Sequence, residues 1–141
     1  MTVGLGGCVT NNGDIGIWYG VWALDAIEID GQPDDTWQQP DSWTNFSFQN
    51  DIVYVARVND LQDELNYSWG TWSQDGNTLT LNFSHSSDDP SQSGRYLPPS
   101  WIFIDRPVTS FTLDSADARN VVMTTTDDDG RRITYHLRKT Y

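Results

Sequence analysis

Residues 78–85 alternate strictly between polar and apolar side chains. Leu79, Leu81 and Phe83 fall on one side of an extended chain, and hydroxyl and amide side chains fall on the other. A period of two residues indicates a β-strand with one face buried and one face in water. The pair Asp75-Gly76 just before this run is typical of a two-residue hairpin turn, because both central residues of that turn need a positive φ. The segment is therefore predicted to be one strand of an antiparallel sheet.

The same alternation recurs along the chain, and Gly, Asp, Asn and Pro separate the runs. The eight predicted strands are 17–30, 43–49, 51–59, 65–74, 78–85, 108–114, 119–126 and 131–139. No stretch shows the 3.6-residue apolar period of an amphipathic helix. Eight strands joined mostly by short turns favour an up-and-down barrel, whereas a β-sandwich would need more long crossing connections. The sequence therefore predicts an all-β fold, an eight-stranded up-and-down antiparallel barrel.

Alternation also predicts which side chains face the barrel interior. The predicted inward residues are Phe46, Phe48, Tyr54, Leu65, Tyr67, Trp69, Leu79, Leu81, Phe83, Phe111, Leu113, Val121, Met123, Ile133, Tyr135 and Leu137. A barrel of eight strands is just wide enough to be filled by such side chains or to hold one small ligand.

Loop length is distributed unevenly between the two ends of the predicted barrel. Alternate connections of an up-and-down barrel lie at opposite ends, so 31–42, 60–64, 86–107 and 127–130 share one end. The connections at the other end, 50, 75–77 and 115–118, are short. We therefore expect an open mouth at the end with the long loops.

Aromatic residues are concentrated around this expected mouth. The chain has seven Trp residues, and three of them (Trp37, Trp43 and Trp101) lie in or beside the long loops together with Tyr96. The predicted ligand-binding residues are Trp37, Trp43, Tyr54, Tyr67, Trp69, Tyr96 and Trp101. Aromatic side chains at a barrel mouth can clamp an apolar ligand, stack on sugar rings or plug the barrel, and the sequence leaves these alternatives open.

The charge of the chain argues against nucleic acid as a partner. Twenty acidic residues against eight Lys and Arg give a net charge of −12, which repels polyanions. The length of 141 residues corresponds to one domain, and we expect a monomer.

No motif in the chain predicts catalysis. A G-x-S-x-G nucleophile elbow is absent, and the two histidines, His85 and His136, have no neighbouring His or Cys at metal-ligand spacing. The acidic run 127–129 is interpreted as a solvated hairpin turn rather than a calcium loop. A carboxylate pair for glycoside hydrolysis stays open, because the separation of such a pair is a property of the fold. We expect no catalytic residue, no metal, no cofactor and no enzymatic activity.

Residues near the two chain ends are predicted to meet where the barrel closes. Gly16-Ile17-Trp18 opens the first strand and Arg138 lies near the end of the last, so the guanidinium is expected to stack on the Trp18 indole. This arrangement resembles the lipocalins, in which Gly-x-Trp on the first strand packs against a basic residue of the last. The chain is also similar to the lipocalin-like (calycin) domains of bacterial envelope lipoproteins of unknown function, which end in an acidic Gly-containing hairpin and a Tyr-x-Leu-x-Arg strand, here residues 127–130 and 135–138.

A cysteine near the start of the chain adds to the resemblance. Cys8 ends the tetrapeptide Leu5-Gly6-Gly7-Cys8, which looks like a lipobox and makes Cys8 a candidate for lipidation. We expect residues 1–14 to be a flexible leader and residues 15–141 to be the barrel domain. The resemblance implies a location in the cell envelope, with membrane anchoring through Cys8, although a complete signal peptide is not present.

The expected function is non-enzymatic binding of a small hydrophobic or amphipathic molecule in the barrel mouth. The alternative is a carbohydrate-binding or protein-interaction module that uses exposed Trp residues of the long loops.

Overall fold

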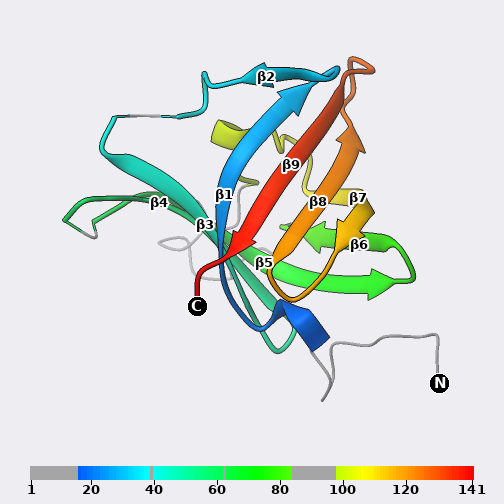
Figure 1. Ribbon diagram of the computed structural model, residues 1–141, viewed down its shortest axis with the longest axis horizontal. Helices are drawn as coiled ribbons and strands as arrows, with labels where there is room; N and C mark the ends of the chain where they lie inside the picture. The colour runs from blue at the N-terminus through cyan, green and yellow to red at the C-terminus, as the bar shows by residue number, and fades with distance from the viewer. Residues whose placement is uncertain (1–15, 39, 62, 84–97) are drawn as a thin grey trace.

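The computed structural model describes residues 16–38, 40–61, 63–83 and 98–141 (Figure 1). The strands are β1 (Gly20–Ile29), β2 (Gln32–Asp34), β3 (Ser42–Gln49), β4 (Ile52–Asn59), β5 (Glu64–Asp75), β6 (Thr78–Asn82), β7 (Val108–Ala116), β8 (Asn120–Thr126) and β9 (Arg132–Lys139). Two 3-10 turns accompany them, η1 (Gly16–Trp18) and η3 (Ser100–Ile102). Within these ranges, no helical segment has the length and apolar character that crossing a membrane requires.

The strands form one antiparallel sheet that closes on itself. Consecutive strands from β3 to β9 pair with each other, β1 pairs with β3, and β1 also pairs with β9 to complete the ring. The short strand β2 was not predicted; it lies outside the ring and pairs only with the end of β1. The ring thus contains eight of the nine strands, and the predicted up-and-down antiparallel barrel is confirmed.

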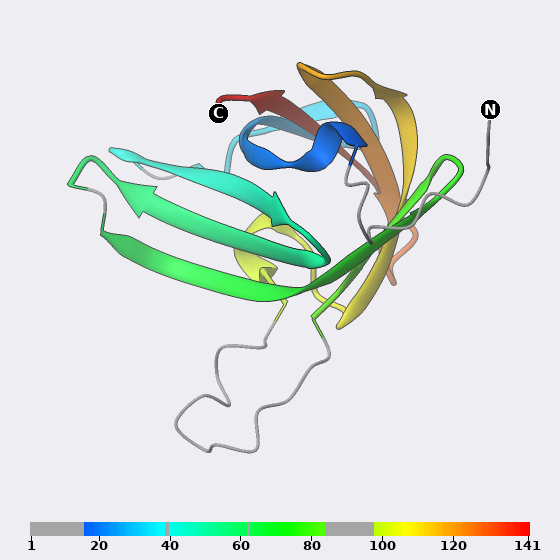
Figure 2. The same cartoon turned by 90° about the horizontal axis from the view of Figure 1, so that it is seen from below.

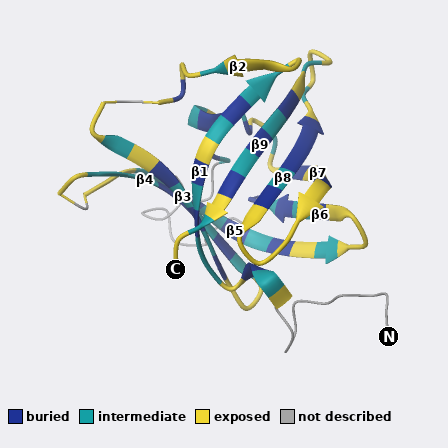
Figure 3. Ribbon diagram, in the orientation of Figure 1, coloured by how far each residue is buried: buried dark blue, intermediate teal, exposed yellow. Residues whose placement is uncertain are grey.

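Alternating apolar side chains fill the barrel, as the bands of buried residues along β9 in Figure 3 illustrate. Twelve of the predicted inward residues are buried: Phe46, Phe48, Leu79, Leu81, Phe83, Phe111, Leu113, Val121, Met123, Ile133, Tyr135 and Leu137. Trp18, Phe48 and Trp72 form an aromatic cluster among them, with ring centroids 5.0–6.1 Å apart. Apolar side chains thus occupy the centre of the barrel.

The prediction was wrong for Tyr54, Leu65, Tyr67 and Trp69, which lie on the outer face. On β4, Val53 and Val55 flank Tyr54 and are completely buried. The face of the strand that carries these valines therefore turns toward the core. Leu65 is 46% exposed, and Tyr67 and Trp69 are only half-buried. Both strands carry apolar residues on both faces, so the period of two alone could not decide which face is buried.

Gly70 fixes which face of β5 turns inward. A Cβ atom at Gly70 would lie 2.0 Å from the carbonyl oxygen of Asn82, so no larger residue fits where β5 presses on the end of β6. Ser68 and Trp72 share the inward face with Gly70 and are buried. The next residue along this face, Gln74, accepts a hydrogen bond from Trp18 Nε1 at 2.8 Å.

The predicted stacking of Arg138 on Trp18 was also wrong. Gly16 and Trp18 lie in η1, ahead of β1, and the Trp18 ring is buried in the aromatic cluster. Arg138 points outward, where Nε donates to Asp25 at 2.9 Å. An exposed ion pair therefore takes the place of the expected cation–π contact at this position.

Lys139 makes the contact that was expected of Arg138. Its Nζ lies 4.7 Å from the centroid of the Trp22 ring and donates to the carbonyl oxygen of Ile17 at 2.8 Å. Lys139 and Trp22 are directly opposite in the β1–β9 register. Burial of the ammonium lowers the pKa of Lys139. A basic residue of the last strand thus packs on a tryptophan of the first strand, but the pair is Lys139 and Trp22 instead of Arg138 and Trp18.

Candidate functional site

Several connections meet at one end of the barrel, as predicted from loop length. The N–H of Asp30, in the turn between β1 and β2, donates to the carbonyl oxygen of Arg132 at 2.8 Å. The Arg132 N–H returns a bond to the Asp30 carboxylate at 3.0 Å. The loop between β8 and β9 also meets residues 103–106, which precede β7. We call this end of the barrel the mouth.

A segment of the chain itself lies in the mouth. Figure 2 shows η3 over the inner side of the sheet formed by β3, β4 and β5. Ile102 and Ile104 are 0% and 1% exposed and belong to the core, and the half-buried Trp101 and Phe103 pack against it. The hydroxyl of Tyr135 donates to the Ile102 carbonyl oxygen at 2.7 Å, and Trp101 Nε1 donates to Thr44 Oγ1 at 3.1 Å. We call residues 100–104 the plug, because they cover the filled interior.

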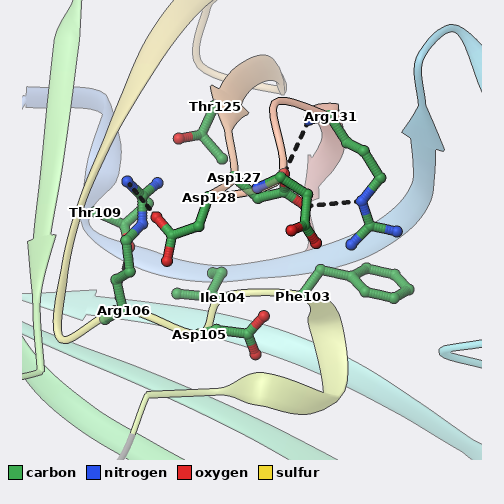
Figure 4. Close-up of a pocket in the computed structure, with 10 residues that line it drawn as sticks. Phe103, Ile104, Asp105, Arg106, Thr109, Thr125, Asp127, Asp128 and Arg131 are labelled. Atoms are coloured by element: carbon green, nitrogen blue, oxygen red, sulfur yellow. Dashed lines mark hydrogen bonds and ion pairs between the residues drawn. The ribbon is translucent and has the colours of Figure 1, made fainter.

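A crevice of about 280 Å³ lies beside the plug (Figure 4). Its lining comes from three parts of the chain: Phe103, Ile104, Asp105 and Arg106 after η3; Thr109 and Thr125 on β7 and β8; and Asp127, Asp128, Asp129 and Arg131 around the last hairpin. Apolar side chains of the plug thus adjoin a group of charged side chains, which suits an amphipathic rather than a purely apolar ligand.

Hydrogen bonds hold the charged side of the crevice in place. Asp127 accepts bonds from the backbone N–H groups of Asp129 and Arg131 at 3.0 and 2.9 Å, and from Arg131 Nε at 2.8 Å. Arg106 donates to the Thr126 carbonyl oxygen at 2.8 Å and lies 3.7 Å from the Asp128 carboxylate. The interpretation of 127–129 as a hairpin turn agrees with these bonds, because Asp127 organises the turn.

These contacts shift the ionisation of two groups. Burial acts to raise the pKa of Asp127, but the bonds from the Arg131 N–H and guanidinium outweigh it and hold the pKa below its ordinary value. The same bond and charge raise the pKa of Arg131. The pair therefore stays charged over the whole neutral range. No group of three His, Cys, Asp or Glu side chains in the described ranges is arranged to hold a metal ion.

A row of polar side chains lies on the inner face near the plug. Thr44, Arg57 and Asn66 are directly opposite one another on β3, β4 and β5, so their side chains share one face. Thr44 is buried and bonded to Trp101 of the plug, which identifies the face as the inner one. We call these three residues the inner polar row. Sequence reasoning missed Arg57 and Asn66 because it placed the opposite faces of β4 and β5 inside.

Two of the predicted ligand-binding residues lie inward near the mouth. Trp37 is only 6% exposed, and its Nε1 donates to the Asp34 carbonyl oxygen at 2.7 Å. Trp101 is half-buried in the plug. The expectation that these loop tryptophans are exposed was wrong for Trp37. Tyr96 and Cys8 lie outside the described residues, as does the leader 1–14.

Four other predicted residues gather on the outer face of β3, β4 and β5. Trp43 is 38% exposed, and Tyr54 stacks on Tyr67 with ring centroids 5.9 Å apart. Tyr54 and Trp69 are directly opposite in the β4–β5 register. We call Trp43, Tyr54, Tyr67 and Trp69 the outer aromatic face. Tyr54, Tyr67 and Trp69 are thus neighbours on the outside of the barrel, and Trp43 lies on the same outer face of the sheet.

Comparison with solved structures supports the fold. The chain is similar to a lipocalin-like protein from Bacteroides uniformis ATCC 8492, with a TM-score of 0.59 and 15% sequence identity over 89% of this chain and 100% of that chain. No protein-family model matches the sequence, and the search of curated proteins gave no match. At this low identity the likeness concerns architecture, and the closed barrel described above agrees with it. The protein therefore has the fold of a lipocalin-like domain.

Proposed function

We propose that the protein is a non-enzymatic binding module for a small amphipathic molecule held at the barrel mouth. A lipocalin-like barrel suggests a ligand-binding module, because the fold is generally a binding fold rather than an enzyme fold. The observation that carries the proposal is the crevice beside the plug, where Phe103 and Ile104 adjoin Asp105, Arg106 and Arg131. Such a lining offers both apolar contact and charge to one ligand.

The mouth is favoured over the centre of the barrel for a steric reason. Phe111 and Tyr135 pack edge to face at 5.5 Å in the interior, and Tyr135 also bonds to the plug. A ligand in the centre would have to displace these side chains, whereas one beside Phe103 would not. We therefore place the ligand between the plug and the hairpin that carries Asp127.

A neutral fluorescent probe tests this proposal. N-phenyl-1-naphthylamine should bind saturably, and Phe103→Ala should weaken its binding by about tenfold, because the ring supplies much of the apolar surface of the crevice. The matched control is Tyr19→Ala, since Tyr19 is an exposed aromatic residue next to η1. Unchanged probe binding by Phe103→Ala, or no saturable binding by the wild type, would contradict a ligand site at the mouth.

The outer aromatic face favours one alternative, a carbohydrate-binding or protein-interaction module. Trp43 offers an exposed indole there, and Tyr54 and Tyr67 lie on the same outer side of the sheet. Retention on immobilised oligosaccharides that is lost in Trp43→Ala but kept in Phe103→Ala would support this alternative over the mouth site.

We also propose a location in the cell envelope, with the chain anchored through a lipid on Cys8. The support is the tetrapeptide Leu5-Gly6-Gly7-Cys8, which looks like a lipobox. Labelling with a radioactive fatty acid in a bacterial host tests it: incorporation should be lost in Cys8→Ser, and an unlabelled wild type would contradict it.

A further inference from the structure

The inner polar row combines two buried polar atoms that have no hydrogen-bond partner. These atoms are Arg57 Nε and Asn66 Oδ1. Thr44, the third member, is already bonded to Trp101 of the plug. A buried donor or acceptor without a partner is costly, and native proteins satisfy nearly all of them. The row is thus a place where a ligand would supply the missing bonds.

The charge of Arg57 is also uncompensated within the described ranges. Three other arginines there pair with carboxylates: Arg106 with Asp128, Arg131 with Asp127 and Arg138 with Asp25. No such ion pair joins Arg57 to any carboxylate within the described ranges. Arg57 is half-buried on the inner face of the barrel, so a negatively charged ligand group would stabilise its guanidinium by forming an ion pair with it.

The position of the row relative to the plug brings polar and apolar side chains together. Thr44 connects the row to Trp101, whose indole is half-buried, and Phe103 follows in the same segment. The next inward-facing residue after Thr44 on β3 is Phe46, and the inward-facing residue before Arg57 on β4 is Val55. Both are buried, and they are directly opposite each other. Polar and apolar groups therefore adjoin here as well.

We propose that Arg57 binds the oxyanion head group of an amphipathic ligand and that Asn66 lies beside this head group, which makes the ligand an anion with an apolar body. The Nε and one terminal nitrogen of a guanidinium form a planar fork that matches two oxygens of a carboxylate, sulfonate or phosphate. Asn66 Oδ1 accepts a hydrogen bond from a hydroxyl or N–H group beside that oxyanion. This inference rests on the proposed binding at the mouth and adds the chemistry of the head group.

A series of ligands with one tail and different head groups tests the inference. Decanoate, decanol and decyltrimethylammonium are used below their aggregation concentrations to displace N-phenyl-1-naphthylamine at pH 7. Decanoate should displace the probe at a concentration about tenfold lower than decanol, and the cation should do no better than decanol. Decyl sulfate and decyl phosphate then distinguish which oxyanion the pair prefers.

Substitutions assign the preference to Arg57. In Arg57→Gln, decanoate should bind no better than decanol, while decanol binds as in the wild type. The matched control is Arg119→Gln, which makes the same change in net charge at an exposed residue in the turn between β7 and β8. If Arg57→Gln fails to fold, Arg57→Lys keeps the charge without the fork, and the preference for decanoate should fall by about threefold or more.

The outcomes separate the two proposals. Equal binding of decanoate and decanol by the wild type would overturn the inference, as would a decanoate preference that survives in Arg57→Gln. Binding at the mouth would stand in both cases. Absence of saturable probe binding by the wild type would overturn the proposed function itself.

Discussion

Single residues decide features of this barrel that the alternation of strands leaves open. Gly70 is one of them, because the carbonyl oxygen of Asn82 would lie only 2.0 Å from a Cβ atom at this position. Gly70→Ala should destabilise the protein by about 3 kcal/mol or more, since the clash is with backbone rather than with a flexible side chain. Urea unfolding measures the effect.

Gly76 supplies the matched control for that substitution. A Cβ atom there would meet nothing within 4 Å, although its φ of +58° favours glycine. Gly76→Ala should therefore cost only about 1 kcal/mol of backbone strain. Similar losses in the two variants would show that the contact between β5 and β6 does not require glycine.

Asp127 predicts a dependence of stability on pH. Its pKa is held below the ordinary value of 3.8 in the folded state, so the unfolded chain binds the proton more readily. The stabilisation is complete above that ordinary value and is lost as the pH falls through the lower folded value. The urea midpoint of the wild type should therefore fall more between pH 6 and pH 2 than that of Asp127→Asn.

Asp128 provides the comparison for this pH effect. Its side chain is 77% exposed and, among the described residues, forms one ion pair, the 3.7 Å contact with Arg106. Asp128→Asn should keep the acid-induced fall in the urea midpoint of the wild type. If Asp127→Asn and the wild type lost stability equally, the bonds from Arg131 would not be the source of the effect.

At the scale of elements, the pairing of β1 with β9 shows how far sequence reasoning reached. The two strands and their antiparallel pairing were predicted, but the basic residue that packs on a tryptophan was assigned as Arg138. Alternation from Tyr135 and Leu137, both buried, leads to Lys139 as the next inward position. The signal was therefore present, but the family pattern pointed to the neighbouring residue.

The pairing of β1 with β9 predicts that Lys139 and Arg138 contribute unequally to the stability of the protein. Lys139→Ala should cost about 1–2 kcal/mol, because it removes the contact with Trp22 and the bond to the Ile17 carbonyl. Arg138→Ala should change stability by less than about 1 kcal/mol, since its ion pair with Asp25 is exposed. Thermal unfolding of both variants checks this order, and the reverse order would contradict the assignment of Lys139.

The plug was beyond the reach of sequence periodicity, because residues 100–104 have neither the period of a strand nor that of a helix. The sequence left a plugged barrel open as one alternative for the loop aromatic residues. The face of β4 was equally undecided, since Tyr54 and its valine neighbours are all apolar enough for a core. The strands could thus be predicted from local pattern, whereas the plug and the inner polar row depend on contacts between distant segments.

A bond between the plug and β9 provides a test of that element. Tyr135→Phe leaves the Ile102 carbonyl oxygen without its donor and should cost about 1–3 kcal/mol in urea unfolding. The matched control is Tyr141→Phe, because Tyr141 is 87% exposed and should tolerate the loss of its hydroxyl. Equal stability of Tyr135→Phe and the wild type would mean that this bond does not hold the plug.

The whole molecule combines a filled barrel with one chemically mixed end. Eight strands close around apolar side chains, and the plug covers them at the end where the connections meet. Apolar plug residues, two paired arginines and the unpaired Arg57 all lie at or near that end. This arrangement supports the proposed binding site at the mouth rather than one in the centre of the barrel.

Nuclear magnetic resonance of the isotopically labelled protein during titration with decanoate tests this central claim most directly. The account predicts that the largest shifts come from the amides of residues 100–106 and 127–131 and from the inner polar row. The hairpin around Gly76 should remain unchanged. Shifts confined to the outer aromatic face, or no saturable shifts at all, would contradict it.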